Sequence, residues 1–213
     1  MDYYSKYDAI LTHCYGKKVL HLGCVGNNDS ATETKVAASP STLHLKLSAA
    51  AEVTGVDISA EAIDEYKRLG ICDNILVGDV EKLEALRLRP EFDVIVIGDL
   101  IEHLSNPGHM LDGVRELCRT DTEVILTTPH AFGLAGFLRH FAKRFREGQQ
   151  HVMTFNQQNL SNLVERHGFQ VLGVDTCHQP EAARGWLFRA GKALFSLFPH
   201  LGGTLFFRLR KSD

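Results

Sequence analysis

The segment Phe92-Asp93-Val94-Ile95-Val96-Ile97-Gly98-Asp99 decides the fold of this 213-residue chain. Its four consecutive β-branched residues favour an extended strand, and Gly98 and Asp99 mark the end of that strand. The run lacks polar alternation, which is typical of a central strand covered on both faces. It therefore predicts a mostly parallel sheet with helices packed on both sides.

Similar short apolar runs lie on either side of this strand. They are rich in Val, Ile and Leu and are bounded by Gly or Asp, so each predicts a further strand. These strands are expected at residues 17–23, 52–57, 74–79, 123–128 and 169–175, with a last one at 204–210.

Helical patterns separate the strands. Ser59 is expected to cap one helix that ends before Gly70, and Asn106-Pro107 is expected to open another. A third helix begins after Asn156, and a fourth is expected to begin near Ser39-Pro40. This alternation of strands and helices predicts βαβ units in a single α/β domain over residues 1–213.

Composition excludes several classes of protein. A net charge of −3 argues against a nucleic-acid partner, and the chain has no run of about 20 apolar residues that could span a membrane. The five cysteines include no Cys-x-x-Cys pair, so neither a disulfide framework nor a zinc site is expected. The N-terminus lacks the apolar segment of a signal peptide. We expect a cytoplasmic protein that could also lie at a membrane surface.

The ends of the strands carry the chemistry-bearing residues, because ligands of an open parallel sheet bind at the carboxyl ends of its strands. Gly23, Gly26, Asp57, Asp79 and Asp99 all fall at such ends. Each residue alone has a structural interpretation, since a glycine suits a turn and an aspartate suits a helix cap. Four successive strand ends with Gly or Asp favour a ligand site.

At this point the sequence resembles a known family. The segments VLHLGCVG (19–26), VTGVDIS (53–59), LVGDVEKL (76–83), FDVIVIGDLIEHL (92–104) and VILTTPH (124–130) follow the ordered motifs of class I S-adenosylmethionine-dependent methyltransferases. The resemblance runs from Lys17 to Asp175 and looks closest to small-molecule O-methyltransferases of the ubiquinone-pathway type, whose relatives include enzymes that act on sugars and glycolipids.

The resemblance implies a doubly wound seven-stranded sheet in the order 3-2-1-4-5-7-6 with an antiparallel last strand. It implies S-adenosylmethionine as cofactor and S-adenosylhomocysteine as product. The Gly23–Gly26 loop would pass under the methionine part of the cofactor, and Asp57 would hold the ribose. The remaining implied contacts are Ile58 and Val80 beside the adenine, Asp79 at its amino group, and Asp99 and Leu100 near the reacting methyl group.

The chain departs from the family pattern at two places in this loop. His21 stands where the family has an acidic residue, and Cys24-Val25 displaces the middle glycine. Both residues would lie against the cofactor, but a neutral His21 supplies less negative charge toward the methionine ammonium group.

Transfer to an alcohol oxygen benefits from a general base, for which histidine is suited near neutral pH. The candidates are His151, with His103 as the second choice, and His130. Each could instead be a structural or surface histidine. Asp99, Glu102 and His103 also have a D-x-x-E-H spacing that resembles a divalent-metal set of some ubiquinone-pathway relatives, but we expect Glu102 and His103 to orient the loop and no metal to bind.

Two other functions compete with methyl transfer. An NAD-dependent oxidoreductase could use Asp57 and the glycines, but the chain has no G-x-G-x-x-G and no second catalytic domain. A non-catalytic S-adenosylmethionine-binding module could have kept the fold and lost activity, and the departures at His21 and Cys24 keep this alternative open.

Three segments do not follow the alternation of strands and helices. Residues 27–39 form a polar insertion, 139–156 would cap the substrate side, and 181–203 mix basic and aromatic residues. Basic residues beside aromatic ones suit weak contact with an anionic membrane, although they equally suit packing on the sheet. We expect the acceptor to be a small molecule or a saccharide, and the membrane argument adds a lipid-linked acceptor as an alternative.

Overall fold

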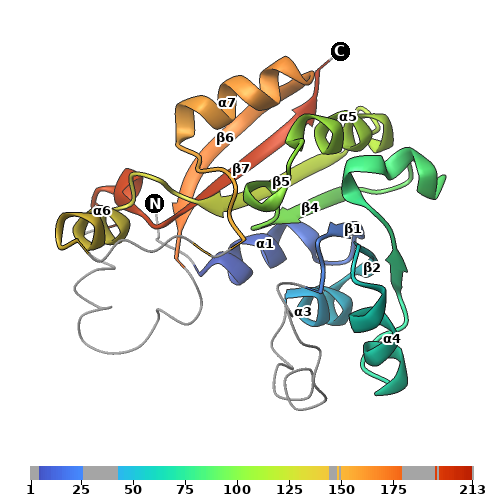
Figure 1. Ribbon diagram of the computed structural model, residues 1–213. Helices are drawn as coiled ribbons and strands as arrows, with labels where there is room; N and C mark the ends of the chain where they lie inside the picture. The colour runs from blue at the N-terminus through green and yellow to red at the C-terminus, as the bar shows by residue number, and fades with distance from the viewer. Residues whose placement is uncertain are drawn as a thin grey trace.

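The computed structural model describes residues 5–25, 43–143, 148, 150–178, 195 and 197–212. A seven-stranded sheet crosses the molecule, with helices on both sides (Figure 1). The strands are β1 (Lys18–Leu22), β2 (Glu52–Asp57), β3 (Ile75–Val77), β4 (Val94–Gly98), β5 (Glu123–Pro129), β6 (Phe169–Cys177) and β7 (Thr204–Lys211).

The strand order is β3-β2-β1-β4-β5-β7-β6, which confirms the predicted order. Strands β1 to β5 pair in parallel, whereas β7 pairs antiparallel with both β5 and β6. The chain leaves β1 in one direction along the sheet and returns to β4 on its other side. This arrangement creates a topological switch point between the carboxyl ends of β1 and β4, where open α/β sheets bind ligands.

The helices pack in two layers. In Figure 1, α5 (Pro107–Leu117) and α7 (Gln157–Arg166) lie above the sheet, and α1 (Lys6–Cys14), α3 (Leu43–Ala50) and α4 (Ala60–Arg68) lie below it. The remaining helical segments are α6 (Leu134–Phe141) and the short 3-10 turns η1 (Val80–Leu86), η2 (Ile101–His103) and η4 (Pro199–Leu201).

The predicted helix boundaries follow from local capping. The Ser59 side chain accepts a hydrogen bond from Ala62 N, and Pro107 occupies the first turn of α5. Asn156 and Asn159 form a reciprocal capping box at the start of α7. The predicted start of a helix near Ser39-Pro40 lies outside the described residues, and α3 is described from Leu43 onward.

Alternate faces of the strands bury two cores. One core joins the sheet to η1, α5 and α7, and includes Ile95, Ile97, Met110, Val114 and Phe207. The other joins it to α1 and α3 through Ile10, Leu47, Val94, Val96 and Ile125. The four β-branched residues of β4 thus contribute to both cores, as the apolar run of that strand predicts.

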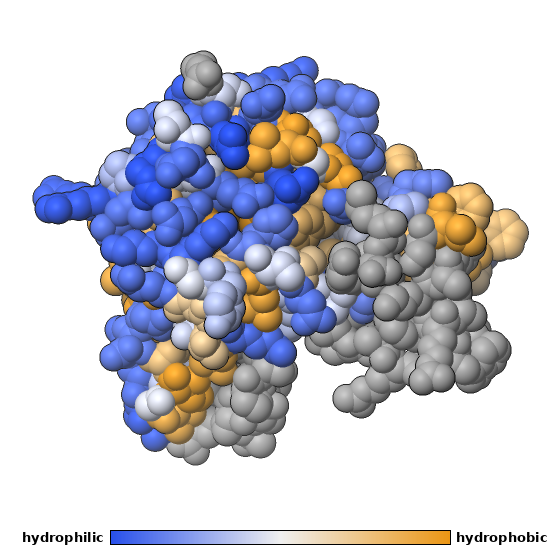
Figure 2. Space-filling model, turned by 180° about the vertical axis from the view of Figure 1, so that it is seen from behind, coloured by the Kyte–Doolittle hydropathy of each residue, from blue (hydrophilic) through white to orange (hydrophobic). Residues whose placement is uncertain are grey.

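Helix α6 differs from the other helices because it buries no residue. Phe137, Leu138 and Phe141 are exposed, and Figure 2 shows a hydrophobic patch at its right-hand edge, over this helix. Among the described residues, no helix has the length and apolar character needed to cross a membrane.

Candidate active site

The first element of the candidate site is the turn that follows β1. Gly23 has φ +67°, a conformation that favours glycine, and a Cβ atom at this position would lie 2.8 Å from Leu100 Cδ1. Leu100 therefore packs directly on the Gly23 turn, which brings the ends of β1 and β4 together. The predicted Gly26 and the insertion 27–39 lie outside the described residues.

Asp57 ends β2 beside this turn and is 7% exposed. Its carboxylate accepts hydrogen bonds from Val25 N at 2.9 Å and from Ser59 N at 3.0 Å. Each carboxylate oxygen keeps a further lone pair that could accept from a ribose hydroxyl. The neighbouring Ile58 is 71% exposed, so its side chain is accessible to a ligand.

His21 and Cys24 are almost completely buried, at 3% and 5% exposure. His21 Nδ1 lies 3.2 Å from His44 Nδ1, and the two rings stack. Burial and the nearby His44 lower the pKa of His21 to about 3, so this side chain is neutral. His21 therefore offers no charge to a cofactor, as expected from the replacement of an acidic residue by histidine at this position.

Asp79 and Val80 follow β3. Asp79 caps η1 by accepting from Glu81 N at 2.9 Å, and it pairs with Lys82 at 3.0 Å. These two contacts hold the pKa of Asp79 below its usual value. Val80 is 7% exposed and packs in the core with α5, so little of its side chain remains to contact an adenine ring.

Asp99 follows β4 with a left-handed backbone, φ 48°. Its N–H donates to Thr127 O at 3.0 Å, and its carboxylate accepts from Thr127 Oγ1 at 2.9 Å. The carboxylate also forms a short ion pair with Lys6 of α1. Asp99 is thus held at the rim of the switch point by two other elements.

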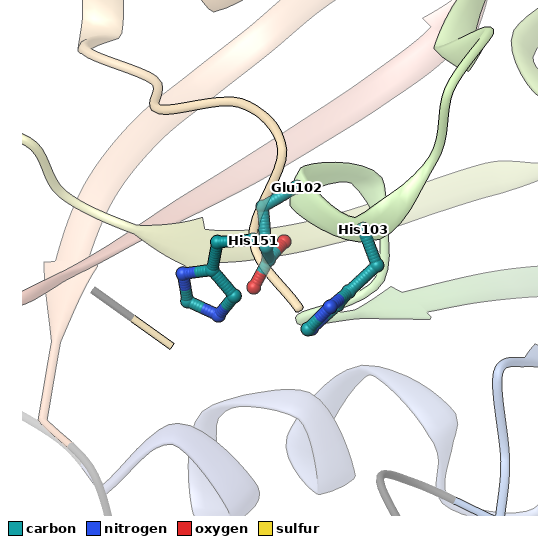
Figure 3. Close-up of side chains that lie close together, drawn as sticks. All are labelled: Glu102, His103 and His151. Atoms are coloured by element: carbon teal, nitrogen blue, oxygen red, sulfur yellow. The ribbon is translucent and has the colours of Figure 1, made fainter. Parts of the chain in front are cut away.

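Glu102, His103 and His151 come together at this rim. One ligand-type atom of each residue lies within 4.8 Å of the others, and the Glu102 carboxylate points between the two imidazole rings in Figure 3. The rings of His103 and His151 meet edge to face at 4.7 Å. The segment that carries His151 is fixed by backbone bonds from Val152 N and Met153 N to Glu102 O.

The electrostatics of this cluster suit proton transfer. Burial and the charge of Asp99 raise the pKa of Glu102 to about 7. Burial also lowers the pKa of His103, whose Nδ1 lies 3.2 Å from Gln150 O. Glu102 Oε2 accepts from Thr128 Oγ1 at 2.9 Å, whereas the buried Oε1 has no hydrogen-bond partner in the part of the chain that the structure describes.

Two hollows on the described surface bear on the site. The larger one, about 950 Å³, lies between η1 and α5, and none of the predicted site residues lines it. The smaller one, about 100 Å³, lies between the end of β5, α6 and residues 151–154, and both Glu102 and His151 line it. The smaller hollow is therefore the candidate acceptor pocket.

A carboxylate and two imidazoles could also hold a divalent metal ion. This set of possible ligands differs from the three residues of the D-x-x-E-H spacing. His151 stands in place of Asp99, whose carboxylate is bound by Lys6 and Thr127. The unpartnered Oε1 of Glu102 fits either a metal ion or a proton. The expectation of no metal stays a prediction.

Comparison with known proteins decides the family. Residues 9–174 match the family model of a methyltransferase domain. The chain belongs to the methyltransferase domain family. This membership favours a methyltransferase over an NAD-dependent oxidoreductase, and the cofactor of the class I methyltransferases is S-adenosylmethionine, as expected from the sequence motifs.

Two curated relatives are ubiquinone biosynthesis O-methyltransferases. The mitochondrial protein of Schizosaccharomyces pombe is 29% identical over 121 residues, which cover 54% of this chain and 39% of that protein. The protein of Glaesserella parasuis is 28% identical over 121 residues, which cover 54% of this chain and 46% of that protein. The methyltransferase chain thus matches less than half the length of either relative.

Solved structures confirm the fold. A possible histamine N-methyltransferase from Thermotoga maritima has a TM-score of 0.64 and 18% identity, with 98% of this chain and 88% of that chain covered. The magnesium protoporphyrin IX methyltransferase of Synechocystis, solved with bound S-adenosylhomocysteine, has a TM-score of 0.59 and 15% identity, with coverage of 97% and 82%.

The loop-orienting role expected for Glu102 agrees with the backbone bonds from Val152 N and Met153 N to Glu102 O. One feature of the candidate site was not predicted from the sequence. Lys6 was not considered at all, because a lysine near the N-terminus carries no signal until the fold places it against Asp99, 93 residues away.

Proposed function

We propose that this methyltransferase transfers the methyl group of S-adenosylmethionine to an oxygen atom of a small-molecule acceptor. The observation that carries the proposal is the Glu102–His103–His151 cluster, which combines a carboxyl of pKa about 7 with two imidazoles beside a small hollow. A group that titrates near neutral pH is suited to accept the proton of a hydroxyl.

S-adenosylmethionine, when bound, supplies a methyl group that is already activated on sulfur. The residues of the chain then have two tasks, to align the acceptor oxygen and to take its proton. The Gly23 turn and Asp57 would hold the methionine and ribose parts, with Ile58 and Asp79 at the adenine. Asp99 and Leu100 would lie nearest the reacting centre, because they connect the Gly23 turn to the cluster.

His151 is the proposed general base. Glu102 orients His151, and its carboxylate stabilises the positive charge that His151 gains with the proton. Both line the candidate acceptor pocket, whereas His103 is turned toward Gln150 O at 3.2 Å. His130 also borders the pocket, but its Nδ1 lies 3.1 Å from Gly202 O and burial lowers its pKa. His103 and His130 are therefore second choices for the base.

The size and lining of the pocket favour a compact acceptor. Its volume of about 100 Å³ is below the roughly 300–1,000 Å³ of common ligand pockets, and Pro129, Ala131 and Met153 give it apolar walls. The curated relatives carry the name O-methyltransferase, which agrees with a hydroxyl acceptor. A saccharide or lipid-linked acceptor stays a prediction from the sequence. So does membrane contact through the basic and aromatic segment 181–203, of which residues 181–194 and 196 lie outside the described residues.

Methylation of a phenol probe tests the proposal. The protein is incubated with S-adenosylmethionine and catechol, and separately with histamine as an amine probe, and products are identified by mass spectrometry. We expect a methyl ether of catechol. Methylation of histamine without methylation of catechol would contradict transfer to oxygen.

Replacement of the proposed base sharpens this test. His151→Ala should lower turnover by on the order of a hundredfold while S-adenosylhomocysteine binds nearly as before, because the base acts on the acceptor. His109→Ala, in α5 beside the larger hollow, is the matched control. Turnover in His151→Ala equal to that of the control would exclude His151 as the base.

A further inference from the structure

Lys6 is a buried cation that the proposed reaction does not use. It lies in the first turn of α1, its side chain is 8% exposed, and its ammonium group forms an ion pair with Asp99. A buried lysine is costly unless a carboxylate compensates its charge. The position of Asp99 at the switch point means that this compensation takes place inside the candidate active site.

The cofactor brings an ammonium group of its own to the same region. The methionine part of S-adenosylmethionine carries an α-ammonium group, which also requires a carboxylate when it leaves water. In the proposed binding mode this part lies over the Gly23 turn, and Leu100 packs directly on that turn. Asp99 is the residue next to Leu100, and its carboxylate stands at the same carboxyl edge of the sheet, on Thr127 and Lys6.

The other acidic or basic groups around the turn are less suited. His21 is neutral because burial and His44 lower its pKa to about 3. Asp57 already accepts from Val25 N and Ser59 N, and in the proposed binding mode its remaining lone pairs hold the ribose. Asp99 is 22% exposed in its side chain, so it is accessible to a ligand.

We propose that the Lys6 ammonium occupies on Asp99 the place that the α-ammonium of S-adenosylmethionine takes when the cofactor binds. Asp99 then takes the role of the acidic residue that is replaced by His21 in this chain. Lys6 determines how easily the cofactor gains access to the Asp99 carboxylate. This inference rests on the proposed position of the methionine over the Gly23 turn, and it is independent of the acceptor.

The surroundings of Lys6 allow the exchange without loss of α1. The backbone of the helix start stays fixed, since Lys6 N donates to His178 O at 2.9 Å and Ser5 bridges to His178. The ammonium group already lies 5.5 Å from the centre of the Tyr7 ring, a second environment that accepts a cation. The Tyr7 ring can therefore take up part of the Lys6 charge when the pair with Asp99 opens.

The test compares two ligands by calorimetry: S-adenosylhomocysteine and its analogue with hydrogen in place of the α-amino group. The wild-type protein should prefer the amino ligand, and Asp99→Asn should reduce this preference to less than about twofold. Lys6→Met should bind S-adenosylhomocysteine several-fold more tightly, with little change for the deaminated analogue. Lys46→Met is the matched control, because Lys46 also lies over the Tyr7 ring, at 5.9 Å.

The double variant Lys6→Met/Asp99→Asn keeps the proposal falsifiable if a single variant folds poorly, because it leaves no unpaired buried charge. It should bind both ligands with similar affinity. A preference for the amino ligand that survives in Asp99→Asn and in the double variant would overturn the proposal. Equal weakening of both ligands in Lys6→Met would also overturn it, since that result indicates a purely structural ion pair.

Discussion

Glu102 shows how the site places a carboxyl group where its proton is retained near neutral pH. The side chain is 1% exposed, and burial together with the charge of Asp99 raises its pKa from 4.5 to about 7. The unfolded chain releases this proton at lower pH, so the folded state binds more protons between about pH 4.5 and pH 7. The contribution of Glu102 to stability is therefore fully present below pH 4.5 and is lost as the pH rises to about 7.

Glu102→Gln should remove this dependence, because an amide does not titrate. The difference in unfolding free energy between the variant and the wild-type protein should change by about 3 kcal/mol at most between pH 5 and pH 8. Urea unfolding at several pH values measures it. His21, whose lowered pKa makes stability fall at acid pH, acts equally in both proteins and cancels. Parallel pH profiles would show that Glu102 is ionised in the folded state.

At the scale of elements, the turn after β1 has no room for a single added methyl group. Gly23→Ala forces a side chain onto φ +67° and against Leu100, 2.8 Å away. Gly70→Ala is the matched control, since Gly70 has φ +64° with no atom within 4 Å of the added Cβ. Both variants should lose about 1 kcal/mol of stability from the backbone conformation.

The two glycine variants should differ in cofactor binding. Gly23→Ala displaces Leu100 and the turn, so affinity for S-adenosylhomocysteine should fall on the order of tenfold, whereas Gly70→Ala should bind normally. Thermal unfolding and calorimetry measure the two effects separately. Equal affinity in both variants would mean that the Gly23 turn does not contact the cofactor.

Strands and capped helices could be predicted from the sequence because their signals are local. The β-branched run of β4, Pro107 at the start of α5 and the Asn156 capping box all act within a few residues. Helix α1 was not predicted, although Tyr7, Ile10, Leu11 and Cys14 recur at helical spacing and pack in one core. The exposure of α6 could not be predicted either, because its apolar side chains would suit a core equally well.

Site residues were predictable where the strand order alone positions them. Gly23, Asp57 and Asp99 lie at strand ends, so parallel pairing brings them to one edge of the sheet. His151 could be named as a candidate but not placed, because its segment reaches Glu102 only through the backbone bonds of Val152 and Met153. The Lys6–Asp99 pair depends on how the N-terminal helix packs, which no local pattern encodes.

At the scale of the whole molecule, the sheet order puts the proposed cofactor site and the proposed acceptor site on one edge of the sheet. The turn after β1 and Asp57 form one end of this edge, and the cluster of Glu102, His103 and His151 forms the other. The central claim is therefore that S-adenosylmethionine binds at the carboxyl ends of β1, β2 and β4, with its ribose on Asp57.

Calorimetric titration of S-adenosylhomocysteine into the wild-type protein, Asp57→Ala and Asp64→Ala tests this claim most directly, with NAD as the competing ligand. Asp64 is an exposed acid on α4 and serves as the control. Thermal unfolding checks that Asp57→Ala stays folded without its bonds to Val25 and Ser59. The account predicts binding of S-adenosylhomocysteine but not of NAD, a loss of roughly 1.5–3 kcal/mol in Asp57→Ala, and no loss in Asp64→Ala. Binding of NAD in preference to S-adenosylhomocysteine, or equal affinity in a folded Asp57→Ala and the wild-type protein, would contradict it.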